Sequence, residues 1–164
     1  MKAYIKNILI NTLLISNTAL VSLNTTYAQD KVTAVKNMVE SQNFVFKAQT
    51  VQPTNGRTRQ LTSEYDLKVL KDSIIAYLPY FGRAYSPPVN PSEGGIQFTS
   101  TEFEYKKTNR KKGGWDIQIK PKAGKDVRQL DLTISENGSA YLVVSSNNRQ
   151  SISFNGYVAD PAVR

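Results

Sequence analysis

The sequence predicts an α+β domain that is mainly β, with one N-terminal helix packed on a curled antiparallel sheet of about eight strands. One stretch near the N-terminus spaces its apolar residues by three and four, whereas most of the remaining chain alternates apolar and polar residues. Short turn signals separate the alternating stretches, which indicates antiparallel pairing of neighbouring strands. A sheet of this length must curl or split to protect its edges, so we expect a barrel-like sheet, with a β-sandwich as the alternative.

Residues 1–28 have the order of a secretory signal peptide. Two lysines form a basic start, an uncharged and mostly apolar stretch follows to Leu23, and small residues precede a cleavage point after Ala28. Asparagines interrupt the apolar stretch, which disfavours a membrane-spanning helix. We therefore expect an exported protein whose residues 29–164 form a single globular domain.

The composition excludes several classes of site. The chain has 164 residues, a net charge of +8, no cysteine and no histidine. Disulfides, thiolate nucleophiles, Ser-His-Asp triads and the usual zinc and haem sites are therefore excluded. The hydrophobic content of 40% and the charged content of 21% are those of a folded globular chain.

The first predicted element of this domain is a helix over about residues 31–42, with Asp30 as its capping residue. A helix of about twelve residues is marginal in water, so its apolar stripe must dock on the sheet or plug one end of it. The stripe consists of Val32, Val35, Met38 and Val39.

Strands are predicted wherever apolar residues recur at every second position. Residues 71–72 indicate a tight hairpin turn, and Asn137-Gly138 indicates a type I′ turn because these residues accept positive φ angles. One stretch, residues 140–144, is apolar on both faces and predicts a strand in the interior of the sheet. The predicted strands are residues 44–51, 65–69, 73–77, 101–106, 115–120, 130–134, 140–144 and 151–158.

An aromatic segment, residues 77–85, is the first candidate site. Pro79 cannot donate to a central ladder, so this segment is predicted to be an edge or rim strand, followed by a stiff loop with three prolines. Rings that stack on apolar faces, beside a guanidinium that binds anions, would suit a sugar or a carboxylate. In the alternative interpretation the rings fill the core and Arg83 stacks on one of them. The candidate ligand-binding residues are Tyr80, Phe81, Arg83 and Tyr85.

A cluster of basic residues at a predicted hairpin tip is the second candidate. Only Glu102 and Glu104 lie nearby in sequence, so we expect the cluster to be exposed and mostly unpaired, with Gly113-Gly114 as a flexible exit. It is either a solvated turn or an electrostatic contact for a lipid phosphate or an acidic glycan. We expect no nucleic-acid partner in an exported protein. The basic cluster consists of Lys106, Lys107, Arg110, Lys111 and Lys112.

Signatures of catalysis are absent from the sequence. It has no glycine-rich phosphate loop, no Gly-x-Ser-x-Gly and no Ser-x-x-Lys. Glu102 and Glu104 could form a carboxylate pair, but they are predicted to lie on the solvated face of their strand. We therefore expect no catalytic residue, no metal and no cofactor.

Six short motifs together resemble a known family. They are Asn43-Phe-Val-Phe46, Arg59-Gln-Leu-Thr-Ser63, Leu78-Pro-Tyr-Phe-Gly-Arg-Ala-Tyr85, Gly94-Gly-Ile96, Gly113-Gly-Trp115 and Ile152-Ser-Phe-Asn-Gly156. Between about Val32 and Val158 the chain resembles an exported Bacteroidetes family of unknown function, DUF4251. The resemblance implies a small β domain in the periplasm or on the surface of a Gram-negative bacterium, and it brings no assigned activity or catalytic residue.

Together these observations favour a non-enzymatic cell-envelope module that binds a small ligand, a glycan or an anionic group. A structural or partner-binding protein of an envelope complex is the alternative, and an enzyme is third. The candidate partners are an envelope glycan, a lipid phosphate and an envelope protein.

Overall fold

The computed structural model describes residues 29–85, 94–122 and 126–162, so the predicted signal peptide lies outside the described residues. A helix over residues 29–40 precedes nine strands. The strands are β1 (Phe44–Pro53), β2 (Arg59–Val69), β3 (Ile74–Leu78), β4 (Ile96–Ser100), β5 (Phe103–Asn109), β6 (Trp115–Pro121), β7 (Val127–Ile134), β8 (Ser139–Ser146) and β9 (Ile152–Ala159).

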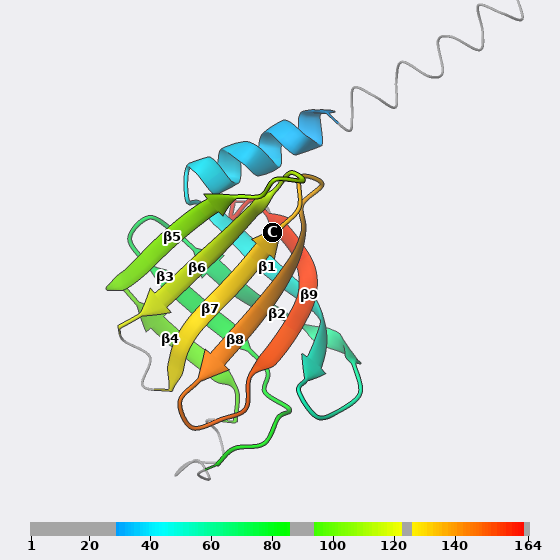
Figure 1. Cartoon of the computed structure of the whole chain (residues 1–164), viewed down its shortest axis with the longest axis vertical. Coiled ribbons are helices and arrows are strands. Elements are labelled where there is room, and N and C mark those ends of the chain that lie inside the picture. Colours follow the sequence, from blue (N-terminus) through cyan, green and yellow to red (C-terminus); the bar gives the residue numbers. More distant parts are fainter. Residues whose placement is uncertain (1–28, 86–93, 123–125, 163–164) are drawn as a thin grey trace, which may run out of the picture.

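The strands form one antiparallel sheet in the order β4-β3-β2-β1-β9-β8-β7-β6-β5. Hydrogen bonds between β1 and β9, from Val45–Ala159 to Pro53–Ile152, join the two meanders into a single curled sheet. Figure 1 shows the result as a nearly closed barrel with the helix across one end. The predicted barrel is confirmed, and the sandwich alternative is wrong because the two halves share this ladder.

The two ends of the sheet, β4 and β5, follow one another directly in the chain. Only Thr101 and Glu102 separate them, and both strands run in the same sense around the barrel. The fully buried Ser100 donates from Oγ to the Glu102 carbonyl at 2.6 Å, and the Lys122 amide donates to the same carbonyl at 2.9 Å. These bonds fix a corner at which one long strand bends. The sequence predicted a strand over residues 101–106, which corresponds to β5, and missed β4.

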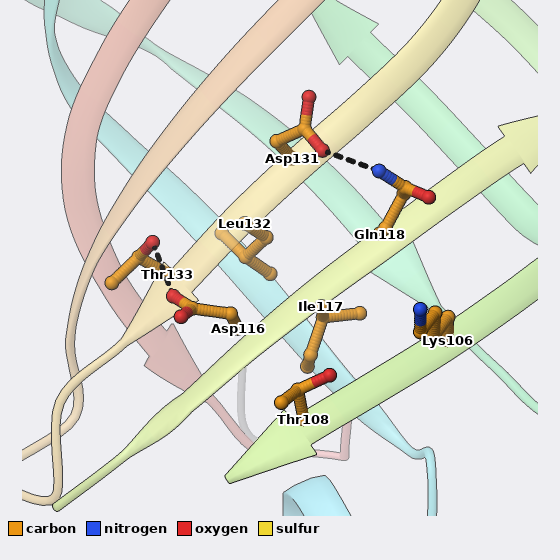
Figure 2. Close-up of a pocket in the computed structure, with 8 residues that line it drawn as sticks. All are labelled: Lys106, Thr108, Asp116, Ile117, Gln118, Asp131, Leu132 and Thr133. Atoms are coloured by element: carbon orange, nitrogen blue, oxygen red, sulfur yellow. Dashed lines mark hydrogen bonds between the residues drawn. The ribbon is translucent and has the colours of Figure 1, made fainter. Parts of the chain in front are cut away.

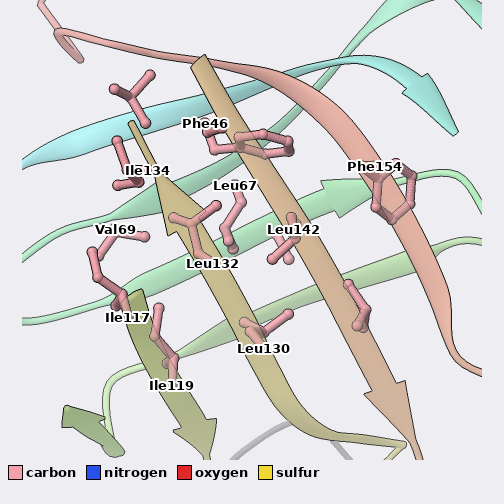
Figure 3. Close-up of a cluster of buried hydrophobic side chains, with 14 of the residues drawn as sticks. Phe46, Leu67, Val69, Ile117, Ile119, Leu130, Leu132, Ile134, Leu142 and Phe154 are labelled. Atoms are coloured by element: carbon pink, nitrogen blue, oxygen red, sulfur yellow. The ribbon is translucent and has the colours of Figure 1, made fainter. Parts of the chain in front are cut away.

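The barrel interior is filled by apolar side chains from both meanders (Figure 3). Along β7, for example, Leu130, Leu132 and Ile134 point inward while the residues between them face outward. The predicted alternation with one wet face is therefore confirmed. The largest fully buried side chains are Phe44, Phe46, Phe154, Leu67, Ile74, Leu78, Ile117, Ile119, Leu130, Leu132, Ile134 and Leu142.

The helix closes one end of this core. Val35 and Val39 are almost fully buried, and Met38 packs against the cluster, which confirms three residues of the predicted stripe; Val32 is only partly buried. The helix occupies residues 29–40 rather than 31–42, so Asp30 lies inside it and is not its cap. It ends where Gln42 adopts a left-handed φ of 51°, from which the chain enters β1.

The turn between β7 and β8 is not the predicted type I′ turn. Gly138 has a φ of 85°, but no positive φ occurs at Asn137, as type I′ would require. The Gly138 amide donates to the Ser135 carbonyl, and the Ser135 amide donates to the Ser139 carbonyl, both at 2.9 Å. This is a three-residue loop that ends in a glycine bulge, a geometry that Asn-Gly also suits.

Tyr105 lies on the inner side of β5, near the end of the barrel that the helix covers. Its hydroxyl is buried and has no hydrogen-bond partner among the described residues. Burial raises the pKa of Tyr105 to about 12, and the nearby Glu40 carboxylate adds to the rise. The folded protein therefore holds this proton more tightly than the unfolded chain does.

Replacing Tyr105 by Phe should make stability less sensitive to alkaline pH. Between pH 10 and pH 12 the unfolded chain loses this proton first, so the parent's free energy of unfolding falls with rising pH. We expect Tyr105→Phe to match or exceed the parent's stability at pH 8 and to lose roughly 1–2 kcal/mol less by pH 12. Urea unfolding at both pH values measures this difference. An equal alkaline loss in both proteins would contradict it.

Candidate functional site

The aromatic segment lies at the rim of the barrel opposite the helix (Figure 1). β3 ends at Leu78, so the predicted strand is wrong beyond that residue, while the predicted rim position is right. The segment then follows the β8–β9 loop through an isolated bridge between Ala84 and Arg149. The Gln150 amide donates to the Arg83 carbonyl at 3.0 Å, and the Tyr85 amide donates to Asn148 at 2.8 Å.

Tyr80 faces inward and fixes the rim segment. Its hydroxyl lies 2.8 Å from the Arg83 carbonyl and 3.0 Å from the Gln150 carbonyl. The Arg149 guanidinium stacks over the Tyr80 ring at 5.2 Å from the ring centre. Burial of the hydroxyl raises the pKa of Tyr80, so it stays a neutral donor. Tyr80 therefore positions its neighbours rather than offering its ring to solvent.

Arg149 is the arginine with a structural role in this region. Its side chain is 16% exposed, and its Nε lies 2.7 Å from an Asp126 carboxylate oxygen. Its Nη1 donates to the Gly95 carbonyl at 3.0 Å, and Asp126 also accepts from the Asn148 amide at 3.0 Å. One ion pair thus ties together the β3–β4, β6–β7 and β8–β9 loops. Arg149 has no signal in the sequence, because its partners are distant along the chain.

The other three predicted rim residues face solvent. Tyr85 is 69% exposed and Phe81 is 43% exposed, so these rings do not fill the core. Arg83 is exposed, and its guanidinium makes no ion pair or hydrogen bond with another described residue. Arg59, from the start of β2, stacks on Phe81 at 5.1 Å from the ring centre. Two guanidinium groups and two exposed rings therefore share this rim. Residues 86–93, in the predicted proline loop, lie outside the described residues.

The basic cluster lies on the β5–β6 hairpin, at the helix end of the barrel (Figure 1). The expectation that its charges are mostly unpaired was wrong for Lys107 and Arg110. Lys107 pairs with Glu40 of the helix at 3.0 Å, and Arg110 pairs with Asp116 at 3.6 Å. Glu102 and Glu104, the acids nearby in sequence, pair instead with Lys122 and Lys120, each at 3.8 Å. Glu40 comes from the helix, whereas Asp116 lies on β6 of the same hairpin, so only the Lys107 pair depends on a contact outside the hairpin.

The tip of this hairpin has a defined turn. Gly113 and Gly114 have φ angles of 84° and 87°, and the Gly113 amide donates to the Arg110 carbonyl at 3.2 Å. Glycine is thus required at these two positions because the turn needs positive φ angles, and not because the chain must be flexible where it leaves the tip. Lys106, Lys111 and Lys112 are exposed, with no ion pair to the described residues. This surface and the rim lie at opposite ends of the barrel, so the fold does not bring the two candidates together.

Two shallow grooves on the outer face of the sheet were not identified from the sequence. The first, of about 300 Å³, crosses β5, β6 and β7 and is shown in Figure 2; we call it the β6–β7 groove. It is lined by Lys106, Thr108, Asp116, Ile117, Gln118, Asp131, Leu132 and Thr133. The second, of about 260 Å³, is the β8–β9 groove. It is lined by Gln52, Pro53, Thr54, Tyr141, Val143, Ser151, Ile152 and Ser153.

The described residues contain no group of three or more acidic, histidine or cysteine side chains that could hold a metal ion. The one carboxylate pair considered from the sequence is solvated, since the side chains of Glu102 and Glu104 are 75% and 70% exposed. In the same part of the chain, no helix has both the length and the apolar character needed to cross a membrane.

A pair of conservative substitutions should distinguish the two arginines of the rim. Arg149→Lys loses the ring stacking and part of the buried network, so we expect it to lower the free energy of unfolding by about 1–3 kcal/mol. Arg83→Lys should change it by less than about 0.5 kcal/mol, because Arg83 is exposed and makes no ion pair within the described part of the chain. Thermal melts of both variants measure the difference. A clear destabilisation by Arg83→Lys would show that Arg83 supports the fold.

Comparison with known proteins places the chain in a family. A family model described as a domain of unknown function, DUF4251, matches residues 26–158. The crystal structure of a DUF4251 family protein from Bacteroides eggerthii is similar, with a TM-score of 0.57 and 18% sequence identity over 82% of this chain and 88% of that chain. None of the functionally curated proteins matches. The predicted resemblance is confirmed: the chain belongs to the DUF4251 family.

Proposed function

We propose that the protein is a non-enzymatic binding module of the bacterial cell envelope, and that its rim binds an anionic group on a glycan. The observation that carries this proposal is Arg83, an exposed guanidinium that pairs with no carboxylate among the described residues and stands between Phe81 and Tyr85 in the chain. Unpaired arginines beside exposed rings are suited to a ligand that has both a charge and an apolar face.

The chemistry of the rim favours an acidic sugar over a simple ion. A planar guanidinium binds a carboxylate or a sulfate through two parallel hydrogen bonds, and the adjacent rings offer apolar surface to a sugar ring. Arg59 adds a second guanidinium, held against Phe81 at 5.1 Å. A uronic acid or a sulfated sugar would use both kinds of contact, whereas a free inorganic anion would use only the charge.

The rim is also pre-organised. Tyr80 and the Arg149–Asp126 ion pair hold the backbone on either side of Arg83 through the contacts described above. A loop fixed in this way loses little conformational entropy when a ligand binds, which raises affinity for a given set of contacts.

Two observations support the non-enzymatic and envelope parts of the proposal. Glu102 and Glu104 are solvated and paired with lysines, an environment unlike that of an acid–base pair in a cleft. The order of residues 1–28 is that of a secretory signal peptide, which would deliver the domain to the periplasm or the cell surface.

Electrophoresis through gels that contain a polysaccharide tests the proposal. We expect polygalacturonate to retard the protein, and fully methyl-esterified polygalacturonate, which lacks the charge, to retard it much less. Arg83→Ala and Tyr85→Ala should each weaken binding at least fivefold, while Arg83→Lys should retain only part of the affinity. Lys111→Ala, which removes an exposed charge at the opposite end of the barrel, is the matched control and should bind like the parent.

The result that would reject the rim as the site is equal retardation of the parent and Arg83→Ala in the charged gel. Binding should also weaken as salt is added, because the contact is largely electrostatic. Retardation that Lys111→Ala abolishes would instead move the anionic contact to the basic hairpin.

A further inference from the structure

The outer face of β8 carries apolar groups that core packing does not explain. The sequence predicted residues 140–144 as a strand in the interior of the sheet, and β8 does lie between β7 and β9. Only Ala140, Leu142 and Val144 point into the barrel. On the outer face, Tyr141 remains 41% exposed and Val143 is partly exposed, with no second layer formed by the described elements. Tyr157, on the neighbouring strand β9, is also 44% exposed, so this part of the outer face offers aromatic surface to another molecule.

Tyr141 is the centre of a row of side chains that crosses five strands. The strand register places Asp116 opposite Thr133, Thr133 opposite Tyr141, and Tyr141 opposite Asn155. Asn155 lies opposite Thr50 in turn. We call Asp116, Thr133, Tyr141, Asn155 and Thr50 the Tyr141 row. Four strand spacings give it a length of about 19 Å, which suits a chain of several units rather than a single small molecule.

Hydrogen bonds within the sheet already orient the polar members of the Tyr141 row. Thr133 donates from Oγ1 to Asp116 at 2.8 Å, as Figure 2 shows, and Asn155 donates from its amide to Thr50 Oγ1 at 3.3 Å. Arg110 pairs with Asp116 and compensates its charge. Tyr141 has no such bond to a described residue, so its hydroxyl can serve a ligand.

The two outer grooves border this row. Asp116 and Thr133 line the β6–β7 groove, and Tyr141 and Val143 line the β8–β9 groove. Because Thr133 and Tyr141 are opposite one another on neighbouring strands, the two grooves lie next to one another on either side of the β7–β8 pair. A ligand that lies across the strands would therefore rest in both grooves and pass over the Tyr141 ring.

We propose that the Tyr141 row is a second site, which binds a neutral oligosaccharide laid across the outer face of the sheet. Hydroxyl, amide and carboxylate groups at regular spacing match the hydroxyls of a sugar chain, and an exposed tyrosine ring supplies an apolar platform with a polar tip. The five residues of the row include no cation, and Arg110 compensates the charge of Asp116, so an uncharged ligand fits the row; Lys106, which lines the β6–β7 groove, lies beside it on β5. It also lies on a sheet face rather than an edge, so the main-chain pairing by which a peptide adds a strand is not open to it.

Affinity electrophoresis in neutral polysaccharides tests the second site. Gels with hydroxyethylcellulose, galactomannan, laminarin or dextran are compared with a gel that has no polysaccharide. We expect at least one of them to retard the protein, Tyr141→Ala to weaken that binding tenfold or more, and Thr133→Val to weaken it severalfold. Tyr77→Ala removes another exposed tyrosine, 49% exposed on β3, and should bind like the parent.

Testing each variant against the ligand of the other site distinguishes the rim from the Tyr141 row. Arg83→Ala should leave binding of neutral polysaccharide unchanged, and Tyr141→Ala should leave binding of polygalacturonate unchanged. Because Tyr141 is exposed, its variant should keep the parent's thermal midpoint, which separates lost binding from lost folding. The inference is overturned if none of the four gels retards the parent, or if Tyr141→Ala binds as well as the parent. Sedimentation showing that Tyr141→Ala only converts a dimer into a monomer would assign the face to self-association instead.

Discussion

Gly156→Ala is expected to lower the free energy of unfolding by about 3 kcal/mol, one of the two largest single-residue effects that we predict for this protein. Gly156 lies in β9, opposite Ala48, next to the point at which β1 shifts its register. A Cβ at this position would overlap the Lys47 carbonyl oxygen and lie 3.1 Å from the Ala48 Cα. Both atoms belong to the backbone of the paired strand, so relief would require β1 and β9 to move apart.

Gly56→Ala is the matched control, because the nearest atoms to its added Cβ are side-chain carbons of Pro53 at 3.4–3.9 Å. We expect it to change stability by less than about 1 kcal/mol. Urea unfolding, followed by the fluorescence of the single tryptophan Trp115, measures both variants; Trp115 is buried and reports on the barrel. Equal stability of the two variants would mean that β1 and β9 can shift enough to accommodate the added methyl group without loss of stability.

Phe46→Ala should cost about 3–5 kcal/mol, because it removes a large side chain from the centre of a filled barrel. Phe46 is fully buried and lies opposite Val158 of β9 and Leu67 of β2 (Figure 3). Neighbouring strands are fixed by their ladders and cannot collapse into the space, so most of the cavity would remain. The same unfolding measurement gives the magnitude.

Phe81→Ala is the control for this loss, since it truncates the same residue type at a position that is 43% exposed. We expect a cost below about 1 kcal/mol, mainly from the lost stacking of Arg59. A cost similar to that of Phe46→Ala would place Phe81 in the structural core and weaken the proposed role of the rim.

Local patterns in the sequence predicted most of the elements. The stripe of the helix, the inward residues of β7 and the tight turn before β3 follow from spacing and turn chemistry that act over a few residues, and the structure contains all three. β4 was missed because a corner at Thr101–Glu102 divides one strand into two short pieces. That corner depends on bonds from Ser100 and Lys122 to one carbonyl, and Lys122 directly follows β6, the strand paired with β5.

The candidate surfaces were predicted less completely, because ion pairs form across the fold. The sequence identified Arg83 from its aromatic neighbours, and the structure leaves its guanidinium exposed beside two exposed rings. It did not identify Arg149, which pairs with Asp126 and stacks on Tyr80 across three loops. It also placed Lys107 in a solvated cluster, although Glu40 of the helix lies 3.0 Å away.

By itself, the sequence determined the mainly β class, the helix that docks through one stripe, and the rim position of an aromatic and basic segment. It left open whether the rings of that segment fill the core or face solvent. Only the tertiary structure decided that β1 and β9 pair to form one barrel, that the outer face of β8 is uncovered, and that Tyr141 is aligned with Asp116, Thr133, Asn155 and Thr50. The physical reason is the range of the interactions. Periodicity and turn propensity act between near neighbours, whereas closure and register depend on pairing between residues more than a hundred positions apart, such as Val45 and Ala159.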